Sequence, residues 1–169
     1  MKKLSTLIAV ALVSIFALTS CSTSSNKENT STTNTAKEST NSNSATYKDG
    51  TYKATYDKSD KRGWKPQITI VIQNGKIIKT DFNDIDKNGK LKTEDSNYGK
   101  SMKEKNGTEP KEFIPKLDQQ LINSQTASKI DGITGATQST TKFKELSKAA
   151  LDKAKIGDSH EIILPMKEN

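Results

Sequence analysis

Residues 22–46 impose the strongest limit on what this chain can fold into. Nineteen of these twenty-five residues are Ser, Thr or Asn, and none is aromatic or branched aliphatic. A segment of this composition cannot bury enough apolar surface to offset the loss of chain entropy on folding. We therefore expect a flexible tether at 21–46 and a single folded domain at 47–169, a length that allows one ordinary domain and not two.

The first twenty residues have the pattern of an export signal. Lys2 and Lys3 supply a positive start, and the twelve residues 7–18 contain one polar side chain, Ser14. A helix needs about 20 apolar residues to span a bilayer, so this stretch is too short for a membrane span. It fits the apolar region of a signal peptide, and we predict that residues 1–20 are removed from the mature protein.

The residues that follow the apolar stretch, Leu18-Thr19-Ser20-Cys21, resemble the lipobox of bacterial lipoproteins. In such proteins the cysteine thiol is diacylglycerylated, and the cysteine becomes the new N-terminus. Two or more acyl chains, such as palmitate, make a stable anchor. The resemblance implies a lipidated Cys21 on the outer face of the cytoplasmic membrane, in an envelope of the Gram-positive type. An ordinary secretory signal with a chance cysteine is the alternative.

The scarcity of cysteine, histidine and arginine excludes several classes of protein. Cys21 is the single cysteine and His160 the single histidine. A disulfide framework, a cysteine-ligated metal cluster and a Ser/His/Asp hydrolase are therefore disfavoured. Arg62 is the one arginine among 27 basic residues, whereas phosphate and base recognition in nucleic acids favours the arginine fork. We expect no nucleic-acid partner and no metal site.

Alternating apolar residues predict strands at the start of the domain. Isoleucines occupy every second position within 67–73, and Asn74-Gly75 separates this run from a second one at 76–82. A two-residue type I′ turn needs positive φ at both positions, which Asn-Gly accepts readily. The sequence therefore predicts a hairpin here, preceded by a strand whose inward residues are Tyr52, Ala54 and Tyr56.

Helical spacing appears in the second half of the domain. Phe113, Leu117 and Leu121 recur every four residues, and an apolar stripe runs through 141–154. We expect helices at both places, the first beginning near Pro110 or Pro115, and a short strand around 127–130. The predicted fold is α+β, with two or three helices packed on a mostly antiparallel sheet.

The segment before the last helix carries the chemical signal of the chain. It reads Asp131-Gly132-Ile133-Thr134-Gly135-Ala136-Thr137. Its two glycines permit unusual backbone angles and close approach. Two threonine hydroxyls and the start of the next helix can face an anion. From these residues alone, the segment is a candidate phosphate-binding turn or a plain connection into a helix.

The same segment resembles the flavinylation motif of the FMN-binding domain family: Asp, two residues, Ser or Thr, Gly, Ala, then Thr or Ser. Members of that family include FMN-carrying subunits of the Nqr and Rnf complexes and surface lipoproteins of extracellular electron transfer. The export signal, the Tyr47–Tyr52 segment before the first strand and the Asn-Gly hairpin also resemble the family. The resemblance covers residues 47–155.

The resemblance implies a role for each residue of the motif. Thr137 would be the hydroxyl to which a separate flavin transferase joins the 5′-phosphate of FMN as an ester. Asp131 would serve recognition or alignment, and Gly135 and Ala136 would keep the acceptor accessible. Gly132 and Thr134 complete the cofactor-binding segment, and Thr134 is the rival acceptor. The chain lacks the bases for self-modification.

The implied function is electron transfer outside the membrane. FMN exchanges one or two electrons, so the anchored protein would take electrons from a membrane quinol or an NADH dehydrogenase and pass them to an external acceptor. It would act as a carrier and not as a stand-alone catalyst. The alternatives are a non-redox surface binding lipoprotein and the precursor of a peptide pheromone derived from the signal peptide.

Three further side chains are candidates for the walls of a flavin pocket. Trp64, Tyr98 and Met102 could provide flat or polarisable apolar surface for the ring, and packing in the core is the alternative for each. Tyr98 and Met102 are four residues apart and could share one helical face.

The segment 84–95 matches the spacing of a calcium-binding loop. Aspartates occupy its positions 1, 3 and 12, Asn88 position 5 and Gly89 position 6. Three lysines, the absence of a glutamate at position 12 and the absence of flanking amphipathic helices argue against calcium. We interpret the segment as a second Asn-Gly hairpin.

Overall fold

The computed structural model describes residues 47–167. The predicted signal peptide, the lipidation of Cys21 and the tether lie outside the described residues. Within 47–167 no helix combines the length and the apolar character needed to cross a membrane.

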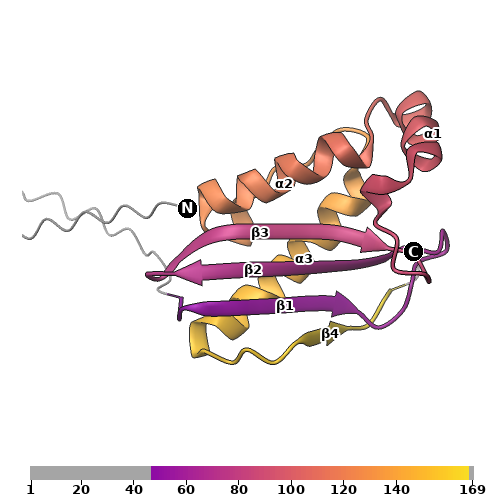
Figure 1. Ribbon diagram of the computed structural model, residues 1–169. Helices are drawn as coiled ribbons and strands as arrows, with labels where there is room; N and C mark the ends of the chain where they lie inside the picture. The colour runs from indigo at the N-terminus through magenta and orange to yellow at the C-terminus, as the bar shows by residue number, and fades with distance from the viewer. Residues whose placement is uncertain (1–46, 168–169) are drawn as a thin grey trace, which may run out of the picture. The chain divides into compact units, whose positions relative to one another are not determined.

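Four strands form one sheet in the order β3-β2-β1-β4 (Figure 1). Their bounds are β1 Gly50–Tyr56, β2 Lys65–Gln73, β3 Lys76–Ile85 and β4 Ile162–Leu164. The β1–β2 and β2–β3 pairs are antiparallel, and the short β4 runs parallel to β1. The mostly antiparallel sheet confirms the predicted fold class.

The predicted hairpin joins β2 to β3. Asn74 and Gly75 both have positive φ, 53° and 70°, as a type I′ turn requires. Asp49, just before β1, accepts a hydrogen bond of 2.8 Å from the Gly75 N–H. The side chain of Asp49 therefore fixes the turn from the neighbouring strand.

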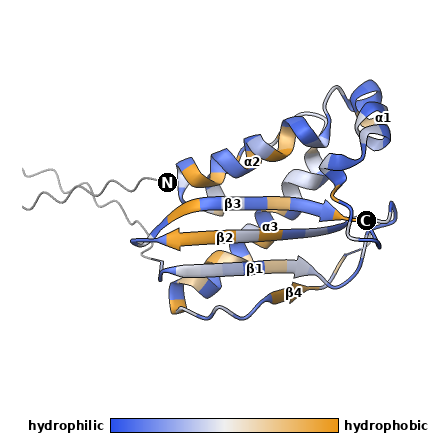
Figure 2. Ribbon diagram, in the orientation of Figure 1, coloured by the Kyte–Doolittle hydropathy of each residue, from blue (hydrophilic) through white to orange (hydrophobic). Residues whose placement is uncertain are grey.

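Three α-helices accompany the sheet: α1 Ser96–Asn106, α2 Pro110–Ser124 and α3 Thr137–Ile156. The helix α2 begins at Pro110, because a proline at the first helical position has no N–H to satisfy. In Figure 1, α3 crosses behind the sheet and α2 follows β3. Figure 2 shows that α1 is the most hydrophilic of the three helices.

The core lies between the sheet and helices α2 and α3. The isoleucines of β2 that the sequence predicts to point inward are at most 2% exposed. Phe82 of β3 meets Phe143 of α3 edge to face, with ring centroids 5.2 Å apart. On α2 the predicted stripe is fully buried, at Phe113, Leu117 and Leu121.

Two predictions about the second half of the chain need correction. The strand predicted at 127–130 is wrong: Ala127–Lys129 is a 3₁₀ turn, η2. Ala127 and Ile130 are both buried, and a spacing of three places both side chains on one side of a 3₁₀ turn. The last helix begins at Thr137 rather than at the predicted residue 141.

Helix α2 also covers the free edge of β3. The Gln125 amide accepts from the Ile77 N–H at 2.8 Å and donates to the Ile77 carbonyl at 3.0 Å. The Asp118 carboxylate accepts from the Phe82 N–H at 3.2 Å. Side chains thus satisfy edge groups that would otherwise be open to pairing with another strand.

Candidate functional site

The motif segment folds into a tight turn that leads directly into α3. The Ala136 N–H donates to the Ile133 carbonyl at 2.9 Å, which closes a turn around Thr134 and Gly135. Gly135 has a φ of +79°, a conformation that L side chains rarely adopt. The turn reverses the chain just before the first helical residue, Thr137.

Gly135 is also required by the space around it. A Cβ built on this residue would lie 2.1 Å from the carbonyl oxygen of Asn106, the last residue of α1. At Gly132 a Cβ would meet nothing within 4 Å. The second glycine of the motif therefore brings the turn against the end of α1, whereas the first one fills no such role in the fold.

The N-terminus of α3 presents backbone donors without a capping side chain. Its N-cap is Ala136, which offers no side-chain acceptor. The first N–H groups of a helix have no partner within the helix, and together with the helix dipole they favour an anion. The exposed Thr137 hydroxyl lies at this point.

Thr140, one turn into α3, forms hydrogen bonds to the backbone of the motif. Its side chain is 4% exposed. Its hydroxyl donates to the Ala136 carbonyl at 3.1 Å and accepts from the Ile133 N–H at 3.3 Å. The sequence interpretation missed this residue, although a threonine three residues after the acceptor can bond back to the preceding turn.

Two cavities of about 510 and 500 Å³ meet at Thr137. Both are within the size range of small-molecule sites. They share three residues, Arg62, Thr137 and Gln138. The first, which we call the loop cavity, lies toward the β1–β2 loop. The second, which we call the helix cavity, lies between the motif and α1.

The predicted site residues distribute unequally between these cavities. Gly135, Ala136, Tyr98 and Met102 line the helix cavity together with Thr137. Asp131, Gly132 and Thr134 line neither cavity. All three are exposed, and the Asp131 N–H donates to the side-chain oxygen of Gln120 at 2.7 Å. Of the two rival hydroxyls, Thr137 alone faces both cavities.

Trp64 lies behind the helix cavity and not in its wall. Its side chain is 5% exposed and meets the Tyr98 ring edge to face, with centroids 5.5 Å apart. Trp64 therefore supports Tyr98. Tyr98 and Met102 both belong to α1 and line the same cavity, in agreement with the shared helical face expected from their spacing.

The loop cavity has a polar wall built from ionisable pairs. Tyr56 donates to Glu145, and burial together with this neighbour raises the tyrosine pKa. Lys142 and Asp60 form an ion pair at 2.8 Å. Burial opposes ionisation of Asp60, but hydrogen bonds from Lys142 and from backbone N–H groups lower its pKa below the usual range. Both carboxylates thus have internal partners.

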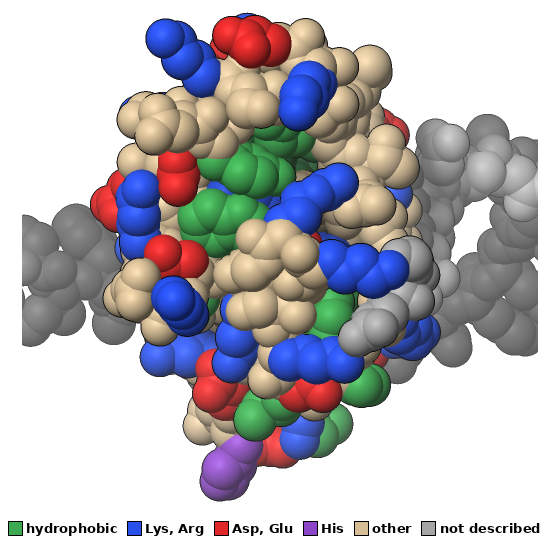
Figure 3. Space-filling model, turned by 90° about the vertical axis from the view of Figure 1, so that its right-hand side faces the viewer, with side chains coloured by type: hydrophobic (Ala, Val, Ile, Leu, Met, Phe, Trp, Pro, Cys, Tyr) green, Lys and Arg blue, Asp and Glu red, His purple; other side chains and the backbone are tan. Residues whose placement is uncertain are grey.

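Arg62 is the functional candidate that sequence reasoning missed. It lines both cavities, and its guanidinium reaches the Gln138 side chain at 3.4 Å. The sequence held one signal for this role, because Arg62 is the single arginine of the chain. Figure 3 shows this end of the molecule: hydrophobic side chains are visible near the middle of the face, with Lys and Arg side chains around them.

The calcium-like segment forms a tight turn. Asp86 N–H donates to the Lys90 carbonyl at 3.0 Å, and Leu91 pairs with Ile85 in an isolated antiparallel bridge. The predicted second hairpin is therefore present in short form. Lys92 begins a 3₁₀ turn, η1 Lys92–Glu94.

Comparisons with known proteins find relatives of this chain. The model of the family described as FMN-binding domain matches residues 63–152. The 15 kDa lipoprotein of Treponema pallidum (strain Nichols) is 32% identical over 114 residues, which cover 68% of this chain and 81% of the relative.

A solved structure shares the fold as well. The CPE2226 protein from Clostridium perfringens superposes with a TM-score of 0.69 at 33% identity, over 72% of this chain and 99% of that one. The family match covers more than half of the chain and includes the Asp131–Thr137 motif, Tyr98 and Met102. This chain belongs to the FMN-binding domain family.

Proposed function

We propose that this protein is a lipid-anchored extracytoplasmic electron carrier in which FMN is joined to Thr137 through a phosphoester. The observation that carries the proposal is the position of Thr137. It is an exposed hydroxyl at an uncapped helix N-terminus, at the meeting point of two cavities, in a chain of the FMN-binding domain family.

The residues around Thr137 fit a phosphate ester. The free N–H groups at the start of α3 can donate to phosphate oxygens, and the helix dipole stabilises their charge. Arg62 lines both cavities beside Thr137 and offers a guanidinium for the same oxygens. Ala136 keeps the N-cap position free of a carboxylate or hydroxyl that would compete for these donors.

The helix cavity fits the flavin ring better than the loop cavity. It is lined by the aromatic ring of Tyr98 and the thioether of Met102, and aromatic and sulfur groups pack well against flat rings. When bound, FMN supplies electron transfer in steps of one or two electrons. Tyr98 and Met102 would hold the ring in this cavity.

The proposed location and partners follow from the N-terminal sequence and from the relative. The Treponema protein is named a lipoprotein, which supports lipidation of Cys21 here. We propose a membrane quinol or an NADH dehydrogenase as electron donor and an external acceptor as the destination. A separate flavin transferase would install FMN from a flavin dinucleotide donor: the Thr137 oxygen bonds to the FMN phosphorus, the phosphoanhydride bond breaks, and the nucleoside monophosphate and the hydroxyl proton leave.

Intact mass after co-expression with a flavin transferase tests this function. The wild-type chain should gain the mass of FMN less one water, and Thr137→Ala should gain nothing. Thr134→Ala is the matched control, because Thr134 is exposed in the same turn but lines neither cavity. An unmodified, colourless wild-type protein would contradict the proposal.

Asp131 offers a second test of the same attachment. Its side chain is exposed, and its known bond in the fold uses the backbone N–H. Asp131→Ala should therefore slow flavin attachment and leave the melting temperature almost unchanged, since exposed positions of this kind change stability by about 0.5 kcal/mol or less. Attachment at the wild-type rate would show that Asp131 plays no part in recognition.

A further inference from the structure

A buried ion pair lies next to the proposed flavin site and has no role in it so far. Lys92 is 4% exposed and Asp84, near the end of β3, is 1% exposed. The lysine Nζ lies 3.0 Å from the aspartate Oδ2. Such a pair brings little net stability compared with apolar residues of similar size, so its presence points to a role in fixing geometry.

The ammonium group of this pair lies against two aromatic rings. Lys92 Nζ is 5.6 Å from the centroid of the Trp64 ring and 5.0 Å from that of Tyr98. Both distances are within the range of cation–π attraction, which strengthens when the cation is removed from water. Lys92 therefore holds both rings, which also contact each other edge to face.

Tyr98 connects the pair to the helix cavity. Its ring lines that cavity, whereas Trp64, Lys92 and Asp84 do not. The start of α1 is fixed as well, because Asp95 caps the Tyr98 N–H at 2.9 Å. Backbone and ring of Tyr98 are thus both held by the segment that resembles a calcium loop.

We propose that Lys92 and Asp84 are positioning residues for the flavin: they fix the Tyr98 wall of the helix cavity and keep a balanced pair of charges behind it. This inference rests on the proposed function, since it assumes a flavin against Tyr98. Removal of either charge would leave the other one uncompensated in a region of low dielectric, where its effect is large. The two removals should therefore shift the reduction potential of the flavin in opposite directions.

The test compares variants of the full chain after flavin attachment. Lys92→Met leaves a buried carboxylate, which disfavours added electrons, so the flavin reduction potential should fall. Asp84→Asn leaves a buried ammonium group, so the potential should rise. Lys92→Arg keeps the charge and the ring contact and should stay close to wild type. Lys148→Met is the matched control, since Lys148 forms an exposed pair with Asp152 on α3.

A second readout needs no flavin. Trp64 is the single tryptophan, so the emission of the flavin-free chain reports its contact with Lys92. The intensity or wavelength of the Trp64 emission should change in Lys92→Met. Both should stay at the wild-type values in Lys92→Arg and Lys148→Met. If Lys92→Met does not fold, the test uses Asp84→Asn and the double variant Lys92→Met/Asp84→Asn. The reduction potential of the double variant should lie between those of wild type and Asp84→Asn.

The outcomes separate this inference from the proposed function. Intact mass shows whether flavin is attached to each variant. Shifts of opposite sign at full attachment support the inference. Unchanged potentials, or shifts of one sign in both single variants, would overturn it while leaving the attachment site intact. If wild type itself gains no flavin, the proposed function fails and the charge effect with it, and Trp64 emission alone still tests the contact with Lys92.

Discussion

The segments 131–137 and 84–95 use their polar groups in opposite ways. In the first, Thr137 is exposed, and no side chain caps the first N–H groups of α3. In the second, the carboxylates are directed to partners within the protein: Asp84 to Lys92 and Asp86 to the N–H groups of Asn88 and Lys90.

This difference separates a ligand site from a support. A site needs polar groups that the fold leaves available, whereas groups that already have partners contribute to shape. The hydrogen bonds of Asp86 lower its pKa, as expected for a carboxylate that serves backbone donors. The segment with the more recognisable metal-like spacing is therefore the support, and the glycine-rich turn is the site.

Removal of Lys92 should have the largest effect on stability. Lys92→Met leaves the Asp84 carboxylate buried without its cation, a change that costs about 3–5 kcal/mol. The exposed pair of Lys148 and Asp152 gives the comparison, and Lys148→Met should cost no more than about 0.5 kcal/mol. Urea unfolding of the two variants measures both values. Equal costs would show that the 84–95 segment does not support the fold.

The second-largest effect on stability should separate the two glycines of the motif. Gly135→Ala places a Cβ against the Asn106 carbonyl in a backbone conformation that disfavours it, and should cost about 2–4 kcal/mol. Gly132→Ala meets no neighbour within 4 Å and should change stability by about 0.5 kcal/mol or less. Thermal unfolding compares them. Equal losses would mean that the turn does not depend on its approach to α1.

Asp118 extends the comparison to a partly buried carboxylate beside a like charge. Burial, with a smaller effect from Asp81, raises its pKa to about 8. A carboxyl group whose pKa is raised in the folded state stabilises the fold at low pH, and this contribution is lost as pH rises from about 4 to about 8.

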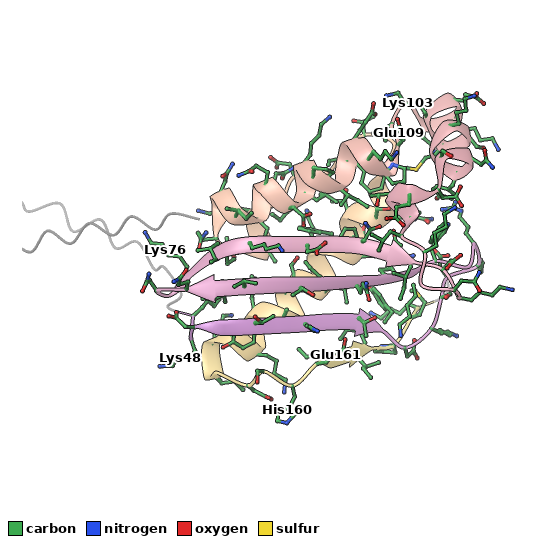
Figure 4. All side chains as sticks on the ribbon, viewed as in Figure 1. Lys48, Lys76, Lys103, Glu109, His160 and Glu161 are labelled. Atoms are coloured by element: carbon green, nitrogen blue, oxygen red, sulfur yellow. The ribbon has the colours of Figure 1, made fainter. Side chains whose placement is uncertain are left out.

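Asp118→Asn removes the stability loss at high pH, because the amide does not ionise. It keeps an oxygen that can accept from the Phe82 N–H. The variant should be more stable than wild type at pH 8 by roughly 1–3 kcal/mol, with the gap closing toward pH 4. Urea unfolding at several pH values measures the gap. Glu161→Gln is the control, because this exposed carboxylate lies beside β4, at the opposite edge of the sheet from β3 (Figure 4). A gap that does not vary with pH would contradict the raised pKa.

Calcium should have the smallest effect. The carboxylates that match a calcium loop bind Lys92 and backbone N–H groups, so a cation would have to displace these partners. Millimolar calcium or a chelator should therefore shift the melting temperature by less than about 1 °C, because a ligand stabilises only the state that it binds. A clear rise with calcium would restore the metal-loop interpretation of 84–95.

Local rules predicted the elements whose residues have strong conformational preferences of their own. Asn74-Gly75 accepts positive φ at both positions, and Pro110 begins α2 because its missing N–H costs nothing there. The 3₁₀ turn at 127–129 was mistaken for a strand, because burial at 127 and 130 resembles alternation over so short a run. The β4 pairing escaped prediction since a three-residue parallel partner of β1 has no local signal.

The site was predictable at its centre and not at its edges. The motif identified the turn, and helical spacing placed Tyr98 and Met102 together. Trp64 was a candidate for the wall with core packing as the alternative, and the fold buries it against Tyr98. Arg62 reaches the site from the β1–β2 loop and Lys92 from beyond β3. These long-range contacts depend on tertiary packing, which no short pattern encodes.

Location of the flavin within the peptide 130–142 tests the central claim most directly. Cleavage after lysine releases this peptide, which contains the rival hydroxyls of Thr134 and Thr137. After co-expression with a flavin transferase, tandem mass spectrometry should place the mass of FMN less one water on Thr137, and Thr137→Ser should retain some of it. Flavin on Thr134, or flavin retained in Thr137→Ala, would contradict the account.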